Sequence, residues 1–580
     1  MINLKILFSG LVSVPLLLLG SCSSDSNNAP EAGTPDSSLS SKGKVYMTVA
    51  VKYPSMRSST DASGNTNSDA NPDFEVGSDE ENSVTSVLIV LTDDSNNYVS
   101  HSIVDNASLA SGVATMQYKA AFDLKDLTNA YKAGLLKEGG SANIWVYCNP
   151  TAQLLENVAG GFAEGWLDWN GTWNGSALDP NLIWNDNAFL MTNSTLYNKR
   201  DLPAPSDWEG YTNVTNSYDL TAGIPVPVER VAARIDFKDG SAGNATYPIK
   251  SIDGEKEILK VRLADMALLN LSKSYYFLRR VSKDGLAAEA YYGGTETPLN
   301  YVVDVDAAAK ASGSITVSNA SDYFNAPLYD ATGKYAPINW EKVSDVLGTP
   351  DDNWLETPTY SKWHYMTENT IPDPSNQITL LTTGIVFRGV LSAGNDASAS
   401  LSAALTDVTA QSPVLLVYDE VIYTGFDEVV EAAKASSSGS IREAATMVLN
   451  AIGSSLDNYT GLTELTPAIK TALSNNGFSI YAPSQDNDGT WGYYCYYFFW
   501  NRHNDNGLSE IMGPMEYAVV RNNVYKLSVD MIGRLGHPVD PDDDPDPVRP
   551  NDPDEKSDLY MSVTFNVIPW VVRVNSVTYP

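Results

Sequence analysis

Basic residues are scarce in this chain of 580 residues, where 37 Lys and Arg stand against 71 Asp and Glu and give a net charge of −34. A surface this acidic repels the phosphates of nucleic acids and the headgroups of anionic lipids, so we predict neither as a ligand. The same charge favours solubility for a protein displayed outside the cell.

Histidine and catalytic motifs are also lacking. The four histidines lie far apart in the sequence, at His101, His364, His503 and His537. The chain has no HExxH, no GxSxG elbow, no CxxC pair and no glycine-rich phosphate loop. The aspartates of 540–544 suggest calcium, but the prolines among them and the missing glycine exclude an EF-hand loop. We therefore predict no enzyme activity, no metal site and no cofactor.

Cysteine is limited to three positions. Residues 1–21 form a secretory leader whose apolar run, 6–19, is too short to span a bilayer. The leader ends in small residues before Cys22, which resembles the lipobox of bacterial lipoproteins, where the cysteine carries the lipid; an ordinary cleaved leader is the alternative. Cys148 and Cys495 could form one disulfide, but both lie in apolar runs, which favours buried free thiols.

The two ends of the chain carry the same strand pattern. Residues 44–54 read KVYMTVAVKYP and 558–567 read DLYMSVTFNV, each alternating apolar and polar positions as a strand with one buried face does. The apolar positions of the first are Val45, Met47, Val49, Val51 and Tyr53. Their counterparts are Leu559, Met561, Val563, Phe565 and Val567, and Trp570 opens a second apolar run after Pro569. Two such strands could occupy one groove and replace each other between subunits; a plain last strand is the alternative.

Each strand is joined to the rest of the chain by a segment with little to bury. Arg57 and Ser58 begin a polar stretch that runs to about residue 82, and such segments are where proteases cut. A solvated surface arginine is the alternative interpretation. Residues 538–557 form a Pro/Asp linker that could carry the last strand roughly 60 Å at about 3.1 Å per residue. Whether the tail could instead fold back into its own groove stays open.

Between the ends, the sequence favours two β units. We expect a first domain over 58–225 and a second over 226–537, with Asp123 capping a helix in the first and a helical insert near 426–475 in the second. Residues 228–237 open the second domain, and further strands are expected at 84–91, 141–148, 259–266, 384–391, 493–500 and 517–531. Helices are expected at 426–434, 441–452 and 467–473. Trp166, Trp169 and Trp173 could stack on sugars or could fix a long loop to the core.

Together these features resemble the fimbrillins of Gram-negative Bacteroidales, the subunits of type V pili, and within them the major subunits of minor fimbriae. The likeness is carried by the lipobox, by VYMTVAV followed by Arg57, and by VERVAARIDF at 228–237. It is carried further by VVRNNVYKLSVDMIGRLGHP at 519–538, the acidic proline linker and the terminal MSVTFNVIPW.

The resemblance implies a mainly β fold: two tandem transthyretin-like β-sandwich domains with a C-terminal donor-strand appendage and a small helical insert. It implies a propeptide at 22–57, lipidation at Cys22 and cleavage between Arg57 and Ser58 by an arginine-specific or trypsin-like protease. It also implies donor strands in 558–580 that fill the groove of an identical or related subunit. The expected location is the outer membrane, through the precursor's lipid, and then an extracellular fimbrium.

Three functions follow as hypotheses. The first is a structural shaft subunit that serves adhesion and biofilm formation, because both a cleavage site and a donor tail are present. The second is a tip or accessory adhesin with a host or bacterial surface ligand. The third is a monomeric surface lipoprotein that binds glycans through tryptophans such as Trp169.

Overall fold

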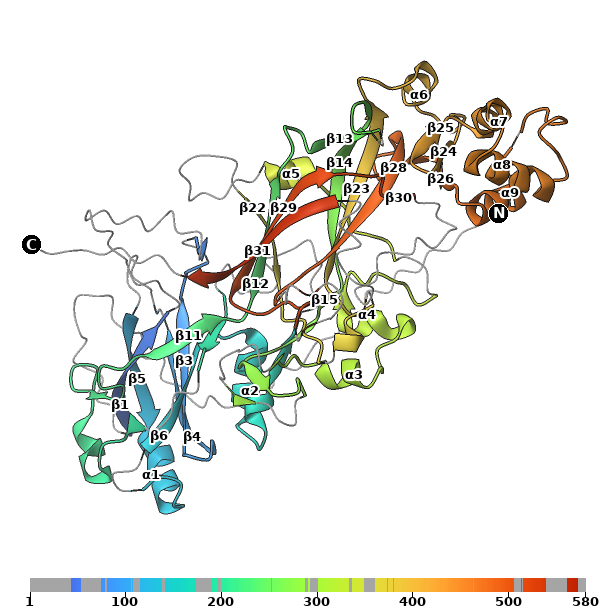
Figure 1. Cartoon of the computed structure of the whole chain (residues 1–580). Coiled ribbons are helices and arrows are strands. Elements are labelled where there is room, and N and C mark those ends of the chain that lie inside the picture. Colours follow the sequence, from blue (N-terminus) through green and yellow to red (C-terminus); the bar gives the residue numbers. More distant parts are fainter. Residues whose placement is uncertain are drawn as a thin grey trace, which may run out of the picture.

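The computed structural model describes residues 43–53, 75–78, 81–105, 107, 115–137, 141–173, 189–195, 200–251, 253–286, 291–292, 301–332, 336–348, 360–372, 374–378, 380–462, 464–504, 508, 513, 515–538 and 561–571. The fold is mainly β, as the sequence predicts. In Figure 1 the molecule is elongated, with one β domain at one end, a second in the middle and the helical insert at the far end.

The N-terminal domain is built on a nine-stranded sheet. Its strands are β1 (Lys44–Lys52), β3 (Ser86–Thr92), β4 (Tyr98–Asp105), β5 (Thr115–Asp123), β6 (Ser141–Cys148), β8 (Met191–Asn193), β9 (Arg200–Asp201), β10 (Tyr218–Asp219) and β11 (Val226–Arg230). Helix α1 (Leu124–Lys132) follows β5, and the Asp123 side chain caps it by accepting from the N–H of Lys125, as predicted. The sheet bends around its own apolar core, in which Val49, Ile89 and Phe122 are fully buried.

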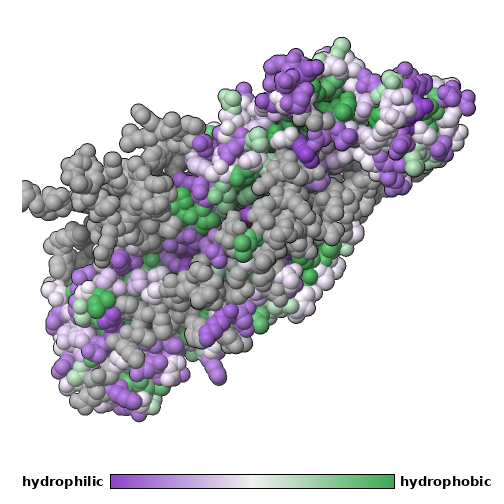
Figure 2. Space-filling model, viewed as in Figure 1, coloured by the Kyte–Doolittle hydropathy of each residue, from purple (hydrophilic) through white to green (hydrophobic). Residues whose placement is uncertain are grey.

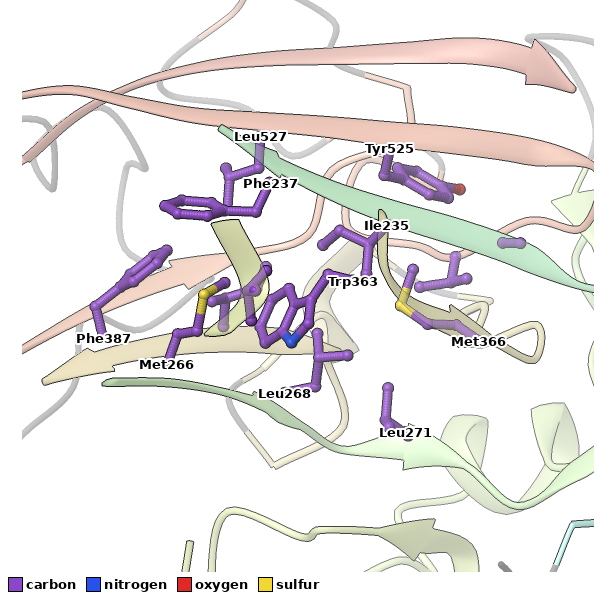
Figure 3. Close-up of a cluster of buried hydrophobic side chains, with 14 of the residues drawn as sticks. Ile235, Phe237, Met266, Leu268, Leu271, Trp363, Met366, Phe387, Tyr525 and Leu527 are labelled. Carbon is purple, nitrogen blue, oxygen red and sulfur yellow. The ribbon is translucent and has the colours of Figure 1, made fainter. Parts of the chain in front are cut away.

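The C-terminal domain is a sandwich of two sheets. One has five strands: β2 (Glu75–Val76), β31 (Met561–Val571), β29 (Asn523–Ile532), β12 (Ala233–Asp239) and β22 (Ser361–Met366). The other has seven: β13 (Thr246–Lys250), β14 (Glu257–Leu269), β21 (Glu341–Lys342), β23 (Gly384–Ala393), β27 (Pro483–Gln485), β28 (Trp491–Trp500) and β30 (His537–Pro538). Figure 3 shows the core between them, where Phe237 and Leu527 face Met266 and Phe387.

Short elements surround these sheets. The small strands are β7 (Asn170–Thr172), β15 (Leu271–Ser272), β16 (Ser274–Tyr276), β17 (Arg280–Ser282), β18 (Tyr291–Tyr292), β19 (Tyr301–Val302) and β20 (Phe324–Asn325). The helices are α2 (Ala152–Gly160), α3 (Ala307–Ala311), α4 (Ala320–Tyr323) and α5 (Val343–Leu347), with 3-10 turns at Trp166–Asp168, Pro205–Gly210, Val317–Asn319 and Pro374–Asn376.

The helical insert is larger than expected and has a core of its own. It comprises α6 (Ala399–Ala404), β24 (Leu415–Tyr418), β25 (Val421–Tyr423), α7 (Phe426–Ala435), α8 (Ser440–Ala451), α9 (Pro467–Asn475) and β26 (Ser479–Tyr481). The three helices predicted at 426–473 are therefore confirmed, and a three-stranded sheet joins them. Its core includes Val430, Val448, Leu449 and Leu473 and is separate from the sandwich core. On the face shown in Figure 2, the insert is largely hydrophilic.

Two sequence expectations need correction. The segment 228–237 does not lie wholly in the second domain, because β11 joins the first sheet and β12 the second, so the first domain extends past the boundary expected at 225. The strand expected from 517 begins only at Asn523. Asn522 adopts the left-handed conformation (φ 59°), and Val519 before it pairs with Asn369 instead.

The separate core of the insert yields a stability prediction. Leu449→Ala leaves a cavity and should destabilise the insert by about 2–5 kcal/mol, producing an early transition in thermal unfolding while the sandwich unfolds as before. Met447→Ala on the same helix is the matched control, because Met447 is 62% exposed and its loss should change stability by less than about 0.5 kcal/mol. If the Leu449→Ala variant unfolded in a single transition at a lower temperature, the insert would not be packed independently of the sandwich.

Candidate functional site

Strand β1 is enclosed on both of its edges. Along one edge it pairs antiparallel with β5 over its whole length, from Lys44 opposite Asp123 to Lys52 opposite Thr115. Along the other edge it pairs in parallel first with β10 and then with β11. The five apolar side chains predicted to face a groove are all buried in the first core: Val45, Met47, Val49, Val51 and Tyr53. The strand therefore fills a slot inside its sheet.

The second face of β1 is covered as well, which differs from the one-sided strand that the alternation predicts. Tyr46, Thr48 and Ala50 are at most 6% exposed. The segment from Tyr211 to Thr221 lies beside them: the Thr48 hydroxyl lies 2.8 Å from the Ser217 hydroxyl. At the edge of the strand, the Tyr46 N–H donates to the Tyr211 carbonyl (2.9 Å), and the Ala50 N–H donates to Thr221 Oγ1 (3.1 Å). Sequence alternation missed this cover because Thr and Ala are tolerated on either face.

A hydroxyl and thiol cluster marks the end of β1. The Tyr53 hydroxyl lies 2.5 Å from the Tyr118 hydroxyl and 3.6 Å from Cys148 Sγ. Burial raises the pKa of the Cys148 thiol to about 12, so it stays protonated. Cys148 and Cys495 are both buried and free, which confirms the expectation of unpaired thiols.

The terminal strand β31 lies on the chain's own C-terminal domain, while β1 occupies the slot in the N-terminal sheet. It pairs antiparallel with β29 from Met561 opposite Ile532 to Pro569 opposite Asn523. The strand continues through Pro569 to Val571, so the two apolar runs on either side of this proline belong to one strand. On its other edge only the two residues of β2 pair with it, opposite Trp570 and Val571. Figure 1 shows β31 beside β29 at the edge of the sandwich nearer the N-terminal domain.

The side chains of β31 are less buried than those of β1. Met561 and Ile568 are buried, whereas Val563, Phe565 and Val567 are half-buried against the sandwich core. The Phe565 ring contacts the rings of Phe499 and Tyr525, with centroids 5.3 and 5.9 Å apart. Leu559 lies outside the described residues, as do Cys22, Arg57 and Ser58.

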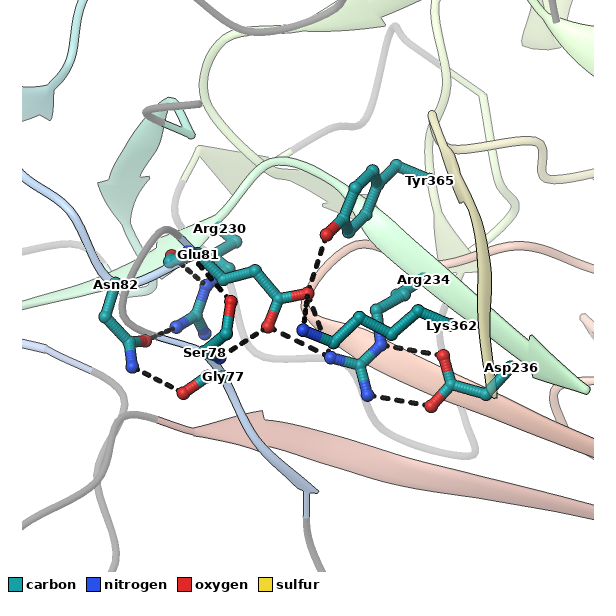
Figure 4. A network of polar contacts seen from close by, with 9 residues as sticks. All are labelled: Gly77, Ser78, Glu81, Asn82, Arg230, Arg234, Asp236, Lys362 and Tyr365. Atoms are coloured by element: carbon teal, nitrogen blue, oxygen red, sulfur yellow. Dashed lines mark hydrogen bonds and ion pairs between the residues drawn. The ribbon is translucent and has the colours of Figure 1, made fainter. Parts of the chain in front are cut away.

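A buried polar network joins the segment before β3 to the sandwich (Figure 4). Arg234 Nη1 donates to both carboxylate oxygens of Glu81 (2.9 and 3.0 Å), and its Nε and Nη2 bind Asp236 (2.8 and 2.7 Å). The Tyr365 hydroxyl donates to Glu81 Oε1 (2.7 Å). Arg230 Nε donates to the Glu81 carbonyl (3.2 Å). These contacts fix residues 77–78 and 81–82 against β12 and β22.

The charges in this network are strongly perturbed. Burial alone would raise the pKa of Glu81, but Arg234, Lys362 and hydrogen bonds from Tyr365 and the Ser78 N–H lower it to about 2. Burial and the nearby Arg234 lower the pKa of Arg230 to about 10, although Glu81 acts in the opposite direction. No periodic pattern in the sequence predicts this network. Two arginines inside the apolar run 228–237 of an arginine-poor chain are the signal that could have revealed it.

The remaining candidates have structural roles. Trp166 and Trp173 are buried, and the Trp166 indole N–H donates to the Asn96 carbonyl (3.1 Å), so these rings fix the loop to the core. Trp169 is half-buried against Phe162. His101 contacts Tyr98, His364 contacts Glu341 and His503 contacts Tyr525.

Two further features are absent from the residues that the structure describes. Within those ranges, no three His, Cys, Asp or Glu side chains cluster as metal ligands would. Among the helices of the same ranges, none is both long and apolar enough to cross a membrane.

Comparison with known proteins points to one family. Residues 492–576 match the C-terminal domain of fimbrillin, described as major fimbrial subunit protein type IV, and this range contains β28, β29 and β31. The matched range is less than a fifth of the chain, so this likeness concerns the C-terminal part of the protein. No curated protein sequence matches the chain.

Solved structures of low similarity include three from Bacteroidales. A Parabacteroides distasonis protein provisionally described as a cell adhesion protein is 12% identical (TM-score 0.38; 92% of this chain and 99% of that one). A fimbrilin from Porphyromonas gingivalis W83 is 14% identical (TM-score 0.35; 92% and 99%). The tip fimbrial protein Mfa3 from Porphyromonas gingivalis is 11% identical (TM-score 0.30; 91% and 100%).

The network predicts a specific dependence of stability on pH. Because the pKa of Glu81 is lower in the folded than in the unfolded chain, its ionised form stabilises the fold above pH of about 4.5, and this stabilisation is lost as the pH falls toward about 2. Glu81→Gln should lower the free energy of unfolding by about 3 kcal/mol at pH 7. Its difference from the wild type should shrink in acid, as measured by urea unfolding.

Glu255→Gln is the control, since Glu255 is exposed and its substitution should leave stability nearly unchanged at every pH. A Glu81→Gln variant as stable as the wild type at pH 7 would show that the network makes no net contribution to the free energy of unfolding.

Proposed function

We propose that this chain is a structural shaft subunit of a cell-surface fimbrium and that it polymerises by donor-strand exchange. In this proposal the precursor is exported as a lipoprotein through Cys22 and cut after Arg57 by an arginine-specific or trypsin-like protease. The released segment 22–57 takes β1 with it. The C-terminal strand of an identical or related subunit then fills the vacated slot.

The proposal rests on the position of β1 inside the N-terminal sheet. The strand is enclosed by β5 on one edge and by β10 and β11 on the other, yet it is joined to the following chain through the segment that contains Arg57. Cleavage there would leave β1 held by non-covalent contacts alone. Its removal would open a slot of strand length, lined by apolar side chains on one side and by unpaired backbone groups on both edges.

Energetics explain why cleavage would act as the switch. Five buried apolar side chains at about 1.5–3 kcal/mol each make β1 worth roughly 10 kcal/mol before entropy is counted. While tethered, β1 also benefits from a high effective concentration beside its slot, which an incoming strand cannot match. Proteolysis removes that advantage, so assembly needs no energy source.

Strand β31 is held loosely enough to leave its own domain. It has a full ladder on one edge and only β2 on the other, and three of its apolar side chains are half-buried. Leaving its own domain therefore costs less than extracting a strand from inside a sheet. In the slot, Met561, Val563, Phe565 and Val567 would take the positions of Met47, Val49, Val51 and Tyr53. Phe565 buries more area than Val51, which favours the incoming strand by about 1 kcal/mol.

The same proposal includes the kind of fimbrium and the position of this subunit in it. The lipobox, the cleavage site and the tail together fit the major subunit of a minor fimbrium, with an adhesion ligand on a host or bacterial surface. A tip adhesin would be expected to lack the donor tail, and a monomeric glycan binder would not need it.

The processing step predicts the ends of the surface protein. N-terminal sequencing and intact mass of surface-extracted protein should give a chain that begins at Ser58 and ends at Pro580. Arg57→Ala should block this product, whereas Arg57→Lys should separate an arginine-specific protease, which rejects it, from a trypsin-like one, which accepts it. A wild-type chain that still begins at Cys22 would contradict the shaft assignment.

Strand exchange should change the reactivity of the Cys148 thiol. Because the Tyr53 hydroxyl covers its thiol, cleavage and loss of β1 should make Cys148 react with maleimide, whereas Cys495, buried in the sandwich, stays protected as an internal control. A synthetic peptide of residues 558–580 should restore the protection, and a Phe565→Asp peptide should not. Cys148 that remains unreactive after β1 is removed would mean that no slot opens there.

Deletion of 558–580 should leave monomers that are cleaved normally but form no ladder on unheated gels. Polymers formed by the deletion variant would rule out the C-terminal strand as the donor.

A further inference from the structure

A lysine, an aspartate and an asparagine meet in the interior of the C-terminal domain, away from both terminal strands. Lys310 lies on α3 and Asp304 shortly before it, and the side chains of both are 0% exposed. Asn369 is 1% exposed and lies 59 positions further along the chain. A buried ion pair of this kind is costly to desolvate and is weak evidence for stability by itself, which calls for another explanation.

The Lys310 ammonium is fixed by three acceptors. Its Nζ contacts Asp304 Oδ2, lies 2.5 Å from Asn369 Oδ1 and lies 3.1 Å from the Thr370 carbonyl. Asp304 is fixed in turn, because its Oδ2 accepts from the Thr370 N–H (2.7 Å) and its Oδ1 from the Asp306 N–H (3.0 Å). The amine is therefore aimed at the carbonyl side of the Asn369 amide, with a carboxylate in contact.

The Asn369 amide is oriented from its other end. Its backbone pairs in both directions with Val519 (3.0 and 2.9 Å). Its Nδ2 donates to the Leu381 carbonyl (2.9 Å), to Thr383 Oγ1 (2.9 Å) and, more weakly, to the Asn270 carbonyl (3.4 Å). These acceptors hold the amide nitrogen away from Lys310 and the carbonyl group toward it. The carbonyl oxygen is thus held against the ammonium, and Cγ, the carbon to be attacked, lies one bond beyond that oxygen.

We propose that Lys310 and Asn369 become joined by an intramolecular amide bond, which the folded chain forms by itself with Asp304 as the proton carrier. In the structure the two side chains are separate groups in contact, which corresponds to the state before the reaction. Nothing in the proposal depends on strand exchange, and it holds for any function of the domain.

The reaction balances without an oxidant or cofactor. The Lys310 ammonium passes one proton to Asp304, and the neutral amine attacks Cγ of Asn369 to form a C–N bond while the C=O electron pair moves onto Oδ1. The attacking nitrogen then gives a proton to the amide nitrogen, the carbonyl re-forms, and the Cγ–Nδ2 bond breaks to release ammonia. The departing ammonia takes the proton from Asp304 and leaves as ammonium, and the carboxylate is restored.

The surroundings favour each step. Ile315, Phe324, Ile371 and Leu381 form an apolar cluster around the site, and the ring of Phe324 lies 5.8 Å from Lys310 Nζ. Proton transfer from Lys310 to Asp304 converts two buried charges into neutral groups, which such surroundings favour. Burial and the neighbouring charge of Asp304 raise the pKa of Asp306 to about 6, so protonation of Asp304 also relieves repulsion between these carboxylates. Fixed contact replaces a bimolecular encounter, which accelerates such reactions strongly.

The test is mass spectrometry of the folded, full-length protein. The wild-type chain should be lighter than its sequence by one ammonia. Trypsin should then release peptides 284–334 and 363–388 as one branched species, uncut after Lys310. Fragmentation that places the branch at Lys310 and Asn369 excludes a succinimide at Asn369, which also loses ammonia but joins no peptides. A wild-type chain of full mass, with linear peptides cut after Lys310, would overturn the proposal.

Variants assign the roles. Asp304→Asn keeps the amine and the amide but removes the proton carrier, so the branched peptide should be lost or much reduced; unchanged yield would overturn the role of Asp304. Lys310→Met should abolish the bond and lower the midpoint of thermal unfolding. Lys273→Met is the control, because the Lys273 ammonium donates to the Ser321 carbonyl at the surface, and its loss should leave the branched peptide intact.

Discussion

The backbone ladders along both edges of β1 are the interaction on which the N-terminal domain depends. A strand inside a sheet satisfies its own hydrogen-bonding groups and those of both neighbours, so its absence would leave β5, β10 and β11 with open edges at once. The apolar side chains of β1 add a second constraint, because they fill part of the N-terminal core and their removal would leave a cavity there. A domain built in this way requires a strand in the slot, whichever chain supplies it.

The two terminal strands are held in opposite ways, and this asymmetry follows from where each lies in its sheet. Strand β1 is interior and covered on both faces, whereas β31 is nearly an edge strand whose outer positions, Thr564 and Asn566, are exposed. An edge strand can leave without opening a ladder on two sides, so the same apolar pattern is stably held at one end of the molecule and readily available at the other. Matching sequences therefore do not imply matching stabilities.

The sequence predicted the strands and helices well where a periodic pattern was continuous, as in β3, β6, β23 and the insert helices. The sequence did not predict the elements whose boundaries are set by tertiary contacts. Segment 228–237 is divided into β11 and β12, and both of its buried arginines bind the same distant segment: Arg230 binds residues 81 and 82, and Arg234 binds Glu81 as well as the nearby Asp236. Such pairings join positions about 150 residues apart, and local periodicity carries no information on them. The covered outer face of β1 and the Lys310 site were missed for the same reason.

The junction between the domains bears on how a filament of such subunits would carry force. Strands β11 and β12 are joined through Val231 and Ala232 alone, and both residues are fully buried. Arg230 and Arg234 fix the two sides of this junction to the segment 81–82. A flexible linker would let the first sheet and the sandwich rotate, but a buried junction flanked by charged hydrogen bonds resists rotation, because any opening would expose unpaired charges. If one subunit's tail occupies the next subunit's slot, tension passes from sandwich to sheet through this junction, so the rigidity of a shaft would arise within each subunit as well as at the contacts between them.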